Sequence, residues 1–413
     1  MKPMGVIPGD YHAEGGRLMI GPKAADAWAR ETDSIGLFVY DFDIITRRIQ
    51  RFRTAMPPKT QLHYAIKANP YNHILSSIMK YVDGFDVASE GEMNFALEAG
   101  MSANNISIAG PGKRRAEIKA AIRAGITINL ESEGEATGAL EAAEELGVRP
   151  RLAVRVNPDF EIKGSGMRMG GGARPFGVDA ERVPALVHTL IEAGADWRGF
   201  HIFAGSQALD ADAIIAAQQA TILLAGELAQ RAGESPPLVN LGGGFGIPYF
   251  AGDQPVDVEK IGQALGEALA ARSAVLADSA FAIELGRWLV GEAGVYLTRV
   301  VDRKVSHGET FLVVDGGLHH QLAASGNFGT VVRRNYPIAV ANRFNDEPEE
   351  EVSVVGCLCT PLDRLADKVL LPRADVGDVI AIFMAGAYGA TASPQAFLGH
   401  LPPGEILVGG SFS

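Results

Sequence analysis

The chain has 413 residues, of which 47% are hydrophobic and 21% are charged, so it can bury a large core. Its formal net charge of -12, with no basic tract, argues against nucleic acid or an anionic membrane as a partner. The first residues carry no apolar segment with a cleavage site, and no run of about 18 apolar residues occurs. We therefore expect a soluble, cytoplasmic protein that binds neither nucleic acid nor membrane.

Short apolar runs alternate with helical segments through the first two thirds of the chain. The runs are 62–67, 84–88, 106–109, 127–130, 152–156, 200–203, 239–241 and 282–284. Ser89 followed by Glu92, and Ser132 followed by Glu135, have the spacing of helix capping boxes. Strands separated by helices pair in parallel, so eight such units predict a closed (β/α)8 barrel, with a doubly wound open sheet as the alternative.

The pattern changes after about residue 300, where strand-like runs follow one another without helices. They are 311–315, 351–355, 368–371 and 379–383, and glycine, proline and charged turns separate them. We assign residues 36–300 to the barrel and residues 1–35 with 301–413 to a β-sandwich or β-barrel-like domain. The short run 37–41, or the segment before it, could complete the sheet of that domain.

Lys67 ends the first apolar run, which reads as a buried strand. An ammonium group in apolar surroundings needs a charged partner, a lowered pKa or a covalent role. A lysine desolvated in this way is a good nucleophile toward an aldehyde such as pyridoxal phosphate. The alternative is a strand-end lysine whose amine extends to solvent.

Other strands of the predicted barrel also end in polar or glycine-rich residues. The glycines 242–244 could present backbone N–H groups to a phosphate, with Arg287 adding charge, or could simply form a tight turn. Glu284 lies in an apolar context and could hold a pyridine nitrogen protonated, or could pair with Arg287. His201 could cover a cofactor ring, or be a core histidine bonded to a carbonyl.

Five motifs in order between residues 38 and 388 resemble those of the pyridoxal-phosphate-dependent decarboxylases with an alanine-racemase-like barrel. That family includes diaminopimelate, ornithine and arginine decarboxylases. The motifs are 64–69, 201–207, 241–245, 284–287 (with leucine in place of the family's proline) and 386–388. The resemblance implies a fold type III enzyme in which Lys67 carries the cofactor, His201 stacks on its ring and Glu284 meets its nitrogen. It assigns the remaining cofactor contacts to Ser206, Gly243, Gly244, Gly286, Arg287 and Tyr388.

A sixth motif, residues 356–363, departs from the family pattern. Cys359 resembles the cysteine that protonates the product carbon across a dimer interface, which implies a homodimer with shared active sites, although Cys357 is an alternative thiol. Thr360 stands where enzymes acting on basic amino acids have an acidic residue, and Asp363 ends the motif. The two cysteines are too close for an ordinary bridge and too few for a disulfide framework or a structural zinc site.

The segment 318–332 is extended relative to diaminopimelate decarboxylases. It precedes Arg333 and Arg334, one of which resembles a residue that holds a distal carboxylate. This extension and Thr360 favour an amino-acid or aminoacyl substrate without a distal ammonium, including a carrier-protein-tethered group, in secondary-metabolite or surface-polysaccharide metabolism. The alternatives are diaminopimelate decarboxylase of lysine biosynthesis, a catalytically silent regulatory homologue, and a metal-dependent barrel hydrolase. We expect no metal ligands, because His319 and His320 lie outside the predicted barrel and no close His-x-His pair ends a strand.

Overall fold

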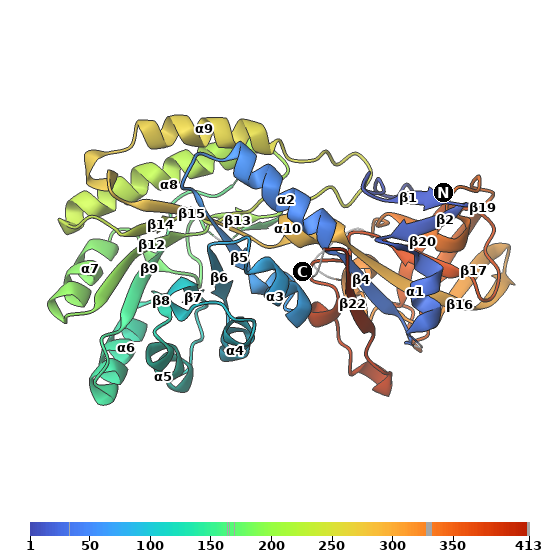
Figure 1. The fold of residues 1–413 in the computed structure, drawn as a ribbon, viewed down its shortest axis with the longest axis horizontal. Helices are drawn as coiled ribbons and strands as arrows, with labels where there is room; N and C mark the ends of the chain where they lie inside the picture. Colours follow the sequence, from blue (N-terminus) through green and yellow to red (C-terminus); the bar gives the residue numbers. More distant parts are fainter. Residues whose placement is uncertain (33, 163, 165, 169, 328–332, 411–413) are drawn as a thin grey trace. The chain divides into compact units, whose positions relative to one another are not determined.

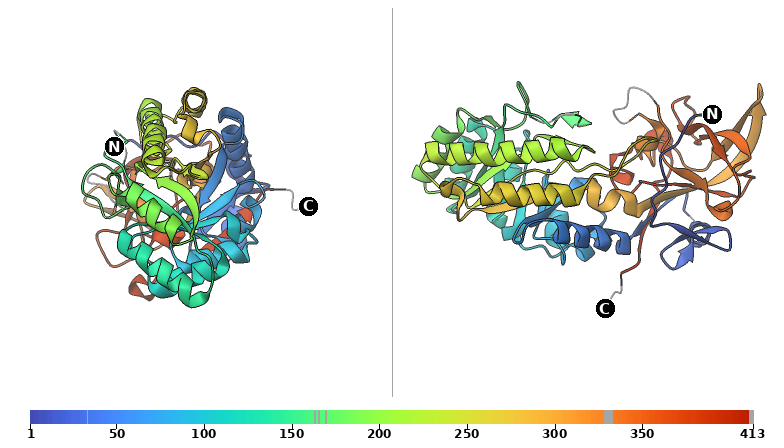
Figure 2. Two further views of the ribbon diagram at one scale, coloured as in Figure 1. Left: turned by 90° about the vertical axis from the view of Figure 1, so that its left-hand side faces the viewer. Right: turned by 90° about the horizontal axis from the view of Figure 1, so that it is seen from above.

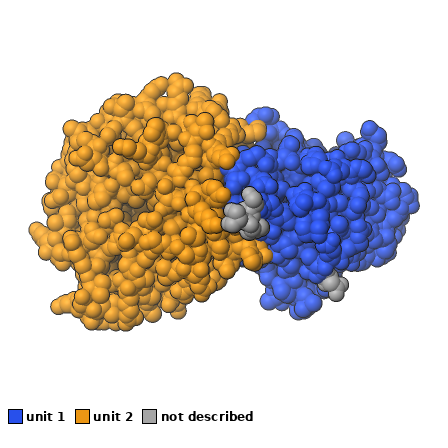
Figure 3. Space-filling view, in the orientation of Figure 1, with its two compact units in different colours: residues 1–48, 247–254, 287–413 blue, residues 49–246, 255–286 orange. Residues whose placement is uncertain are grey.

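The computed structural model describes residues 1–410 except 33, 163, 165, 169 and 328–332 (Figure 1). The chain divides into two compact units, coloured separately in Figure 3. Unit 1 comprises Met1–Arg48, Ile247–Gln254 and Arg287–Ser413, and unit 2 comprises Ile49–Gly246 and Pro255–Gly286. These bounds do not coincide with the 36–300 that we assigned to the barrel, and that assignment stays a prediction.

Unit 2 is a closed parallel barrel of eight strands, as predicted, and the open-sheet alternative is wrong. Its strands are β5 (Gln61–Ala65), β6 (Gly84–Val87), β7 (Ile106–Ile108), β8 (Thr127–Leu130), β9 (Arg151–Asn157), β12 (Asp196–Ile202), β14 (Leu238–Asn240) and β15 (Ala280–Leu285). Each of the eight apolar runs overlaps one strand. Pairing of β15 with β5 and of β8 with β9 closes the barrel.

Helices surround these strands, which is visible when the barrel is viewed end-on (Figure 2, left). They are α3 (Asn72–Ile78), α4 (Glu90–Glu98), α5 (Arg115–Ala124), α6 (Glu133–Leu146), α7 (Val183–Glu192), α8 (Ala211–Ala232) and α9 (Val258–Ala270). The two predicted helix starts are confirmed, because Ser89 Oγ accepts from the Glu92 amide at 3.2 Å and Ser132 Oγ from that of Glu135 at 3.1 Å. These caps start α4 and α6 directly after β6 and β8.

Three two-residue strands complete unit 2. Antiparallel pairing joins β10 (Met167–Arg168) to β13 (Gly205–Ser206), and β11 (Val178–Asp179) lies parallel to β9. The helix α2 (Phe42–Ala55) begins in unit 1 and ends in unit 2.

Unit 1 is mostly β, as predicted. Its main sheet contains β4 (Leu37–Asp41), β16 (Gly294–Ser306), β17 (Glu309–Val314), β18 (Ile338–Val340), β19 (Glu350–Val355), β20 (Arg364–Leu371), β21 (Val379–Ile382) and β22 (Gly404–Val408). The run 37–41 forms β4, which lies between β16 and β22. A second sheet contains β1 (His12–Glu14), β2 (Arg17–Ile20) and β3 (Lys23–Ala24), and the unit also holds α1 (Ala25–Glu31) and α10 (Arg287–Val290).

In the part of the chain that the structure describes, no helix has both the length and the apolar character needed to cross a membrane. Most barrel strands are buried along nearly their whole length, as strands covered on both faces must be. Polar side chains inside such strands are therefore exceptions that need a reason.

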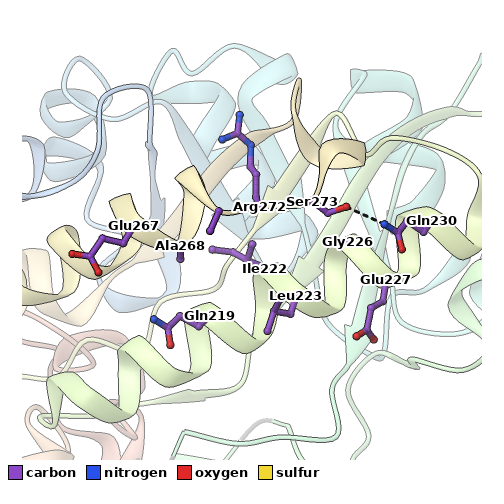
Figure 4. Close-up of a pocket in the computed structure, with 11 residues that line it drawn as sticks. Gln219, Ile222, Leu223, Gly226, Glu227, Gln230, Glu267, Ala268, Arg272 and Ser273 are labelled. Atoms are coloured by element: carbon purple, nitrogen blue, oxygen red, sulfur yellow. Dashed lines mark hydrogen bonds between the residues drawn. The ribbon is translucent and has the colours of Figure 1, made fainter.

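One cavity of unit 2, with a volume of about 450 Å³, lies outside the barrel between α8 and α9 (Figure 4). Glu227 and Glu267 at its edge are exposed, and Gln230 donates to Ser273 within it at 3.0 Å. Arg272 donates to three backbone carbonyls. This cavity contains no buried titratable group, so the chemistry must be sought elsewhere.

Candidate functional site

A smaller cavity of about 290 Å³ lies at the carboxyl ends of the barrel strands. Its titratable and aromatic lining residues are Lys67, Asp86, Arg155, Phe176, His201, Phe203 and Glu284. They come from β6, β9, β12, β15 and the segments that follow the strands. The barrel thus brings together Lys67, His201 and Glu284, which lie far apart in the sequence, at the end where barrel enzymes carry their active sites.

Lys67 follows β5 in a 3-10 turn, η1 (Ile66–Ala68), and not in the strand itself. The turn is anchored because Ile66 and Ala68 are buried, and a Cβ on Gly286 would lie only 2.8 Å from the Ala68 Cβ. The side chain of Lys67 is nevertheless exposed, and its Nζ lies 5.6 Å from the centroid of the Phe203 ring. Our expectation of a lysine desolvated by its strand is therefore wrong, because Lys67 lies in the turn after the strand and its side chain is exposed.

Glu284 and His201 form a buried pair, with His201 Nε2 2.9 Å from Glu284 Oε2. Burial alone raises the pKa of the Glu284 carboxyl, but the His201 hydrogen bond and the charges of His201, Lys67 and Arg155 outweigh it and lower the pKa. His201 Nδ1 is buried and has no hydrogen-bond partner among the described residues. The alternative for His201 was a core histidine bonded to a backbone carbonyl. The structure instead pairs His201 with the Glu284 carboxylate.

Arg155 is a charged residue of the site that our sequence analysis missed. Its Nη1 donates to Glu131 Oε1 at 2.8 Å, and its guanidinium lies 5.0 Å from the Phe176 ring centroid. The Glu131 carboxylate also accepts from the amides of Gly110 and Gly177 at 2.6 and 2.7 Å. Burial raises the pKa of Glu131, but Arg155, with smaller contributions from Lys113 and the Gly110 amide, outweighs it and lowers the pKa. The signal in the sequence was an arginine inside the apolar run 152–156.

Asp86 is a second missed residue and likewise lies inside a buried strand. It accepts a hydrogen bond from Ser107 Oγ, and one of its oxygens lies 3.5 Å from His63 Nδ1. Burial lowers the pKa of His63, but the charge of Asp86 outweighs it and raises the pKa. Asp86 therefore lines the site and also contacts Ser107 and His63 on neighbouring barrel strands. A search limited to the ends of the predicted strands does not find such a residue.

The glycine segment after β14 runs in close contact with neighbouring backbone. A Cβ on Gly243 would lie 1.8 Å from the Glu284 carbonyl oxygen, and a Cβ on Gly244 would lie 2.5 Å from the Gly205 carbonyl oxygen. Gly244 also has a φ of 89°, in the left-handed region. Only glycine fits these positions, and the contact with Gly205 places the predicted Ser206 segment beside the loop.

The same loop offers backbone donors. The Gly242 amide donates to Asn240 Oδ1 at 2.9 Å, whereas the amides of Gly243 and Gly244 donate no hydrogen bond to any residue that the structure describes. Successive free N–H groups of this kind form a cradle for an anion. The segment therefore forms a tight turn and also leaves two amides free, so its role as a phosphate site stays a prediction.

In unit 1, Arg287 and Tyr388 lie together. Arg287 Nη1 donates to the Tyr249 hydroxyl at 2.7 Å, and its guanidinium lies 4.6 Å from the Tyr388 ring centroid. Burial lowers the pKa of Arg287, but the neighbouring tyrosines outweigh it and raise the pKa. Its Nε is buried without a hydrogen-bond partner among the described residues, so this guanidinium can still bind an anion.

The loop 356–363 in unit 1 carries the predicted cysteine and is held by Asp363. This carboxylate is buried, and its two oxygens accept from the amides of Leu318 at 2.7 Å and Leu358 at 2.9 Å. Burial is the main reason that its pKa is raised, although the two hydrogen bonds oppose this. Asp363 thus anchors the loop, while Cys359 is exposed and Thr360 half-buried. A contact between Asp363 and substrate stays a prediction.

The two predicted arginines of unit 1 lie on different neighbours. Arg333 Nη2 donates to the Leu362 carbonyl at 3.4 Å, and the Arg334 guanidinium lies 3.7 Å from the Phe250 ring centroid. Part of the extended segment before them, 328–332, lies outside the described residues. Which arginine meets substrate therefore stays a prediction.

Comparison with known proteins identifies the family. Residues 42–291 match the model of the pyridoxal-binding domain of pyridoxal-dependent decarboxylases. An L-glutamyl-[BtrI acyl-carrier protein] decarboxylase of Niallia circulans is 38% identical over 90% of this chain and 88% of its own. A diaminopimelate decarboxylase of Archaeoglobus fulgidus is 32% identical over 92% of this chain and 89% of its own. The structure of M. jannaschii diaminopimelate decarboxylase with L-lysine matches with a TM-score of 0.87 and 26% identity, covering 96% of this chain and 92% of that one.

The residues described above fit pyridoxal phosphate. Unit 2 offers an amine at Lys67, a carboxylate at Glu284 for the pyridine nitrogen, and two free amides at Gly243 and Gly244 for a phosphate. His201, whose Nδ1 is buried without a partner among the described residues, lines the same cavity as Lys67 and Glu284. The chain belongs to the pyridoxal-dependent decarboxylases, and it is a pyridoxal-phosphate-dependent carboxy-lyase that acts on amino-acid groups.

Proposed function

We propose that this enzyme removes the α-carboxyl group from a substrate whose side chain carries no ammonium, with a glutamyl group on a carrier protein as the first candidate. The observation that carries the proposal is Thr360, which occupies the position of an acidic residue in the family's loop and is half-buried beside Cys359. A threonine hydroxyl cannot neutralise a distal ammonium. The 38% identical relative that acts on a glutamyl carrier protein supports this choice.

The reaction determines through which group the substrate can be attached to a carrier protein. Decarboxylation at Cα requires a free α-amine to react with the cofactor aldehyde and a free α-carboxylate to leave. A carrier can therefore be joined only through the side-chain carboxyl of the glutamyl group. That linkage removes the side-chain charge, so a pocket that offers Thr360 in place of a carboxylate suits such a substrate.

The residues of the site take the following roles in this proposal. When bound, pyridoxal phosphate supplies a protonated pyridine ring that accepts the electron pair released as CO2 leaves. Glu284, kept ionised by His201, holds the proton on the pyridine nitrogen. The amides of Gly243 and Gly244 would donate to the phosphate, and the Lys67 amine would be the group that holds the cofactor through its aldehyde.

A panel of substrates tests the proposal. We expect purified, cofactor-loaded enzyme to release CO2 from the glutamyl carrier thioester and not from free glutamate, lysine, ornithine, arginine or meso-diaminopimelate. Efficient turnover of meso-diaminopimelate would overturn the proposal and place the enzyme with its diaminopimelate-decarboxylase relatives.

Variants of Thr360 serve as the control for this panel. Thr360→Glu restores the charge and is expected to lower kcat/KM for the glutamyl thioester by about tenfold, equivalent to about 1.4 kcal/mol. Thr360→Gln, of the same size without the charge, is expected to change it much less. Equal effects of the two variants would show that size matters at this position and charge does not.

We further infer a homodimer in which Cys359 of each subunit serves the site of its partner by protonating the product carbon. The proposal rests on the resemblance of residues 356–363 to the family's loop and on the exposure of Cys359, which leaves its thiol available. Lys67→Ala and Cys359→Ala chains should each be nearly inactive alone but should regain activity when mixed and allowed to exchange subunits. A mixture as inactive as its components would contradict shared sites.

A further inference from the structure

Three side chains of unit 1 that take no part in the proposed reaction converge on one point. They are His319, after β17; Cys357, in the loop 356–363; and His400, after the 3-10 turn η8 (Phe397–Gly399). Their potential ligand atoms lie within 4.8 Å of one another, and Cys357 Sγ is 3.9 Å from His400 Nδ1. The His319 and His400 ring centroids are 5.1 Å apart.

His319 is a fully buried polar side chain without a hydrogen-bond partner among the described residues. Its exposed fraction is 0%, and neither Nδ1 nor Nε2 has a hydrogen-bond partner among the described residues. The adjacent His320 is equally buried but well satisfied, with Nδ1 2.9 Å from the Tyr296 hydroxyl and Nε2 2.8 Å from the Leu401 carbonyl. An imidazole buried without partners costs free energy unless something binds it.

We propose that His319, Cys357 and His400 bind a zinc ion. One sulfur and two imidazole nitrogens are a ligand set that Zn²⁺ prefers. Zinc bonds of about 2.0–2.3 Å in tetrahedral geometry put neighbouring donor atoms about 3.5 Å apart. The Cys357–His400 separation is already close to this value, and no separation between the three ligand atoms exceeds 4.8 Å, so side-chain rotation can bring in His319.

This site joins three segments that are distant in the sequence. It links the turn after β17, and the segment between η8 and β22 that contains His400, to the loop 356–363. Asp363 already fixes one end of that loop, and zinc at Cys357 fixes the other, on both sides of the exposed Cys359. Three protein ligands leave a fourth position for water or another donor. From the sequence we excluded a structural zinc site because the chain has only two cysteines. We did not consider His319 and His400 as ligands together with Cys357.

The test uses the full-length, cofactor-loaded protein. After removal of metals and dialysis against micromolar Zn²⁺, we expect metal analysis to find one zinc per chain. Titration with Co²⁺ is expected to give the visible absorption bands of a tetrahedral site containing a thiolate. Absence of tight Zn²⁺ binding by the wild-type chain would overturn the proposal.

Three variants locate the ion. Cys357→Ser and His400→Gln each remove a ligand and are expected to weaken binding by about 100-fold or more, since even changes behind the ligands cost 10–100-fold. Cys359→Ser removes the exposed thiol two residues away and is expected to leave the affinity unchanged. The reverse result, with loss only in Cys359→Ser, would place the zinc on the exposed thiol and overturn the proposal.

Thermal unfolding gives a second measurement that does not depend on activity. A metal that binds the folded state and not the unfolded chain raises the midpoint, and the increase grows with the logarithm of the metal concentration divided by its dissociation constant. Zn²⁺ should raise the midpoint of the wild type and of Cys359→Ser but not that of His400→Gln. His400 is half-buried, so its variant remains informative if Cys357→Ser does not fold. Equal stabilisation of all variants would count against the site.

Discussion

Lys67→Ala is expected to abolish decarboxylation. The barrel holds this amine in an anchored turn at the mouth of a cavity that it shares with His201 and Glu284. An amine held beside the cofactor aldehyde acts at a very high effective concentration, so its loss should lower kcat by about 10⁴-fold or more. The measurement is CO2 release, with the absorption of bound cofactor recorded on the same sample.

Two comparisons show whether the effect comes from this amine. Lys80→Ala removes an exposed lysine outside the site and should leave turnover unchanged. A small primary amine added to Lys67→Ala should restore part of the activity, because the variant leaves space where the side chain was. Turnover of Lys67→Ala within tenfold of the wild type would show that Lys67 does not carry the cofactor.

The architecture could be predicted from the sequence because it depends on local patterns. Strands buried on both faces appear as continuous apolar runs, and β5 to β9, β12, β14 and β15 all coincide with such runs. The starts of α4 and α6 were equally readable, since the Ser89 and Ser132 caps involve residues three positions apart. Closure of the barrel followed from the number of units.

The details of the site depended on contacts that the sequence does not contain. Lys67 was expected to be desolvated because it ends an apolar run that was interpreted as a buried strand, but it lies in a 3-10 turn and its side chain is exposed. Arg155 and Asp86 were overlooked because they lie inside apolar runs, and their partners come from other strands. A charged residue inside an apolar run therefore indicates a functional site as strongly as a charged residue at the end of such a run.

The ligand set of the proposed zinc site shows the same limit. His319, Cys357 and His400 are up to 81 residues apart in the sequence, and no spacing motif connects them. Only the fold of unit 1 brings their ligand atoms together and reveals that His319 is buried without a partner among the described residues.

Glu284→Gln is expected to lower kcat by about 10²- to 10³-fold, the usual cost of removing one preorganised electrostatic partner. Glutamine keeps the size and the contact with His201 but cannot hold a proton on a pyridine nitrogen. Glu284→Asp keeps the charge and should retain more activity than the glutamine variant, despite its shorter reach. Steady-state CO2 release for the three proteins at neutral pH measures this, and equal rates for wild type and Glu284→Gln would remove Glu284 from the mechanism.

The same substitution has an expected effect on stability that depends on pH in a defined direction. Burial works to raise the pKa of the Glu284 carboxyl, but His201, Lys67 and Arg155 outweigh it, so the pKa in the folded protein is lowered. A carboxyl whose pKa is lower in the folded protein than in the unfolded chain stabilises the folded state. This stabilisation is fully present at pH values above the pKa of the carboxyl in the unfolded chain, about 4.3, and is lost as the pH falls toward the pKa in the folded protein. Glu284→Gln should therefore reduce the free energy of unfolding by about 2 kcal/mol at neutral pH, with the difference shrinking in acid. Urea unfolding across that pH range measures it, and a difference that grows in acid would mean that the carboxyl is not stabilised as an anion in the folded protein.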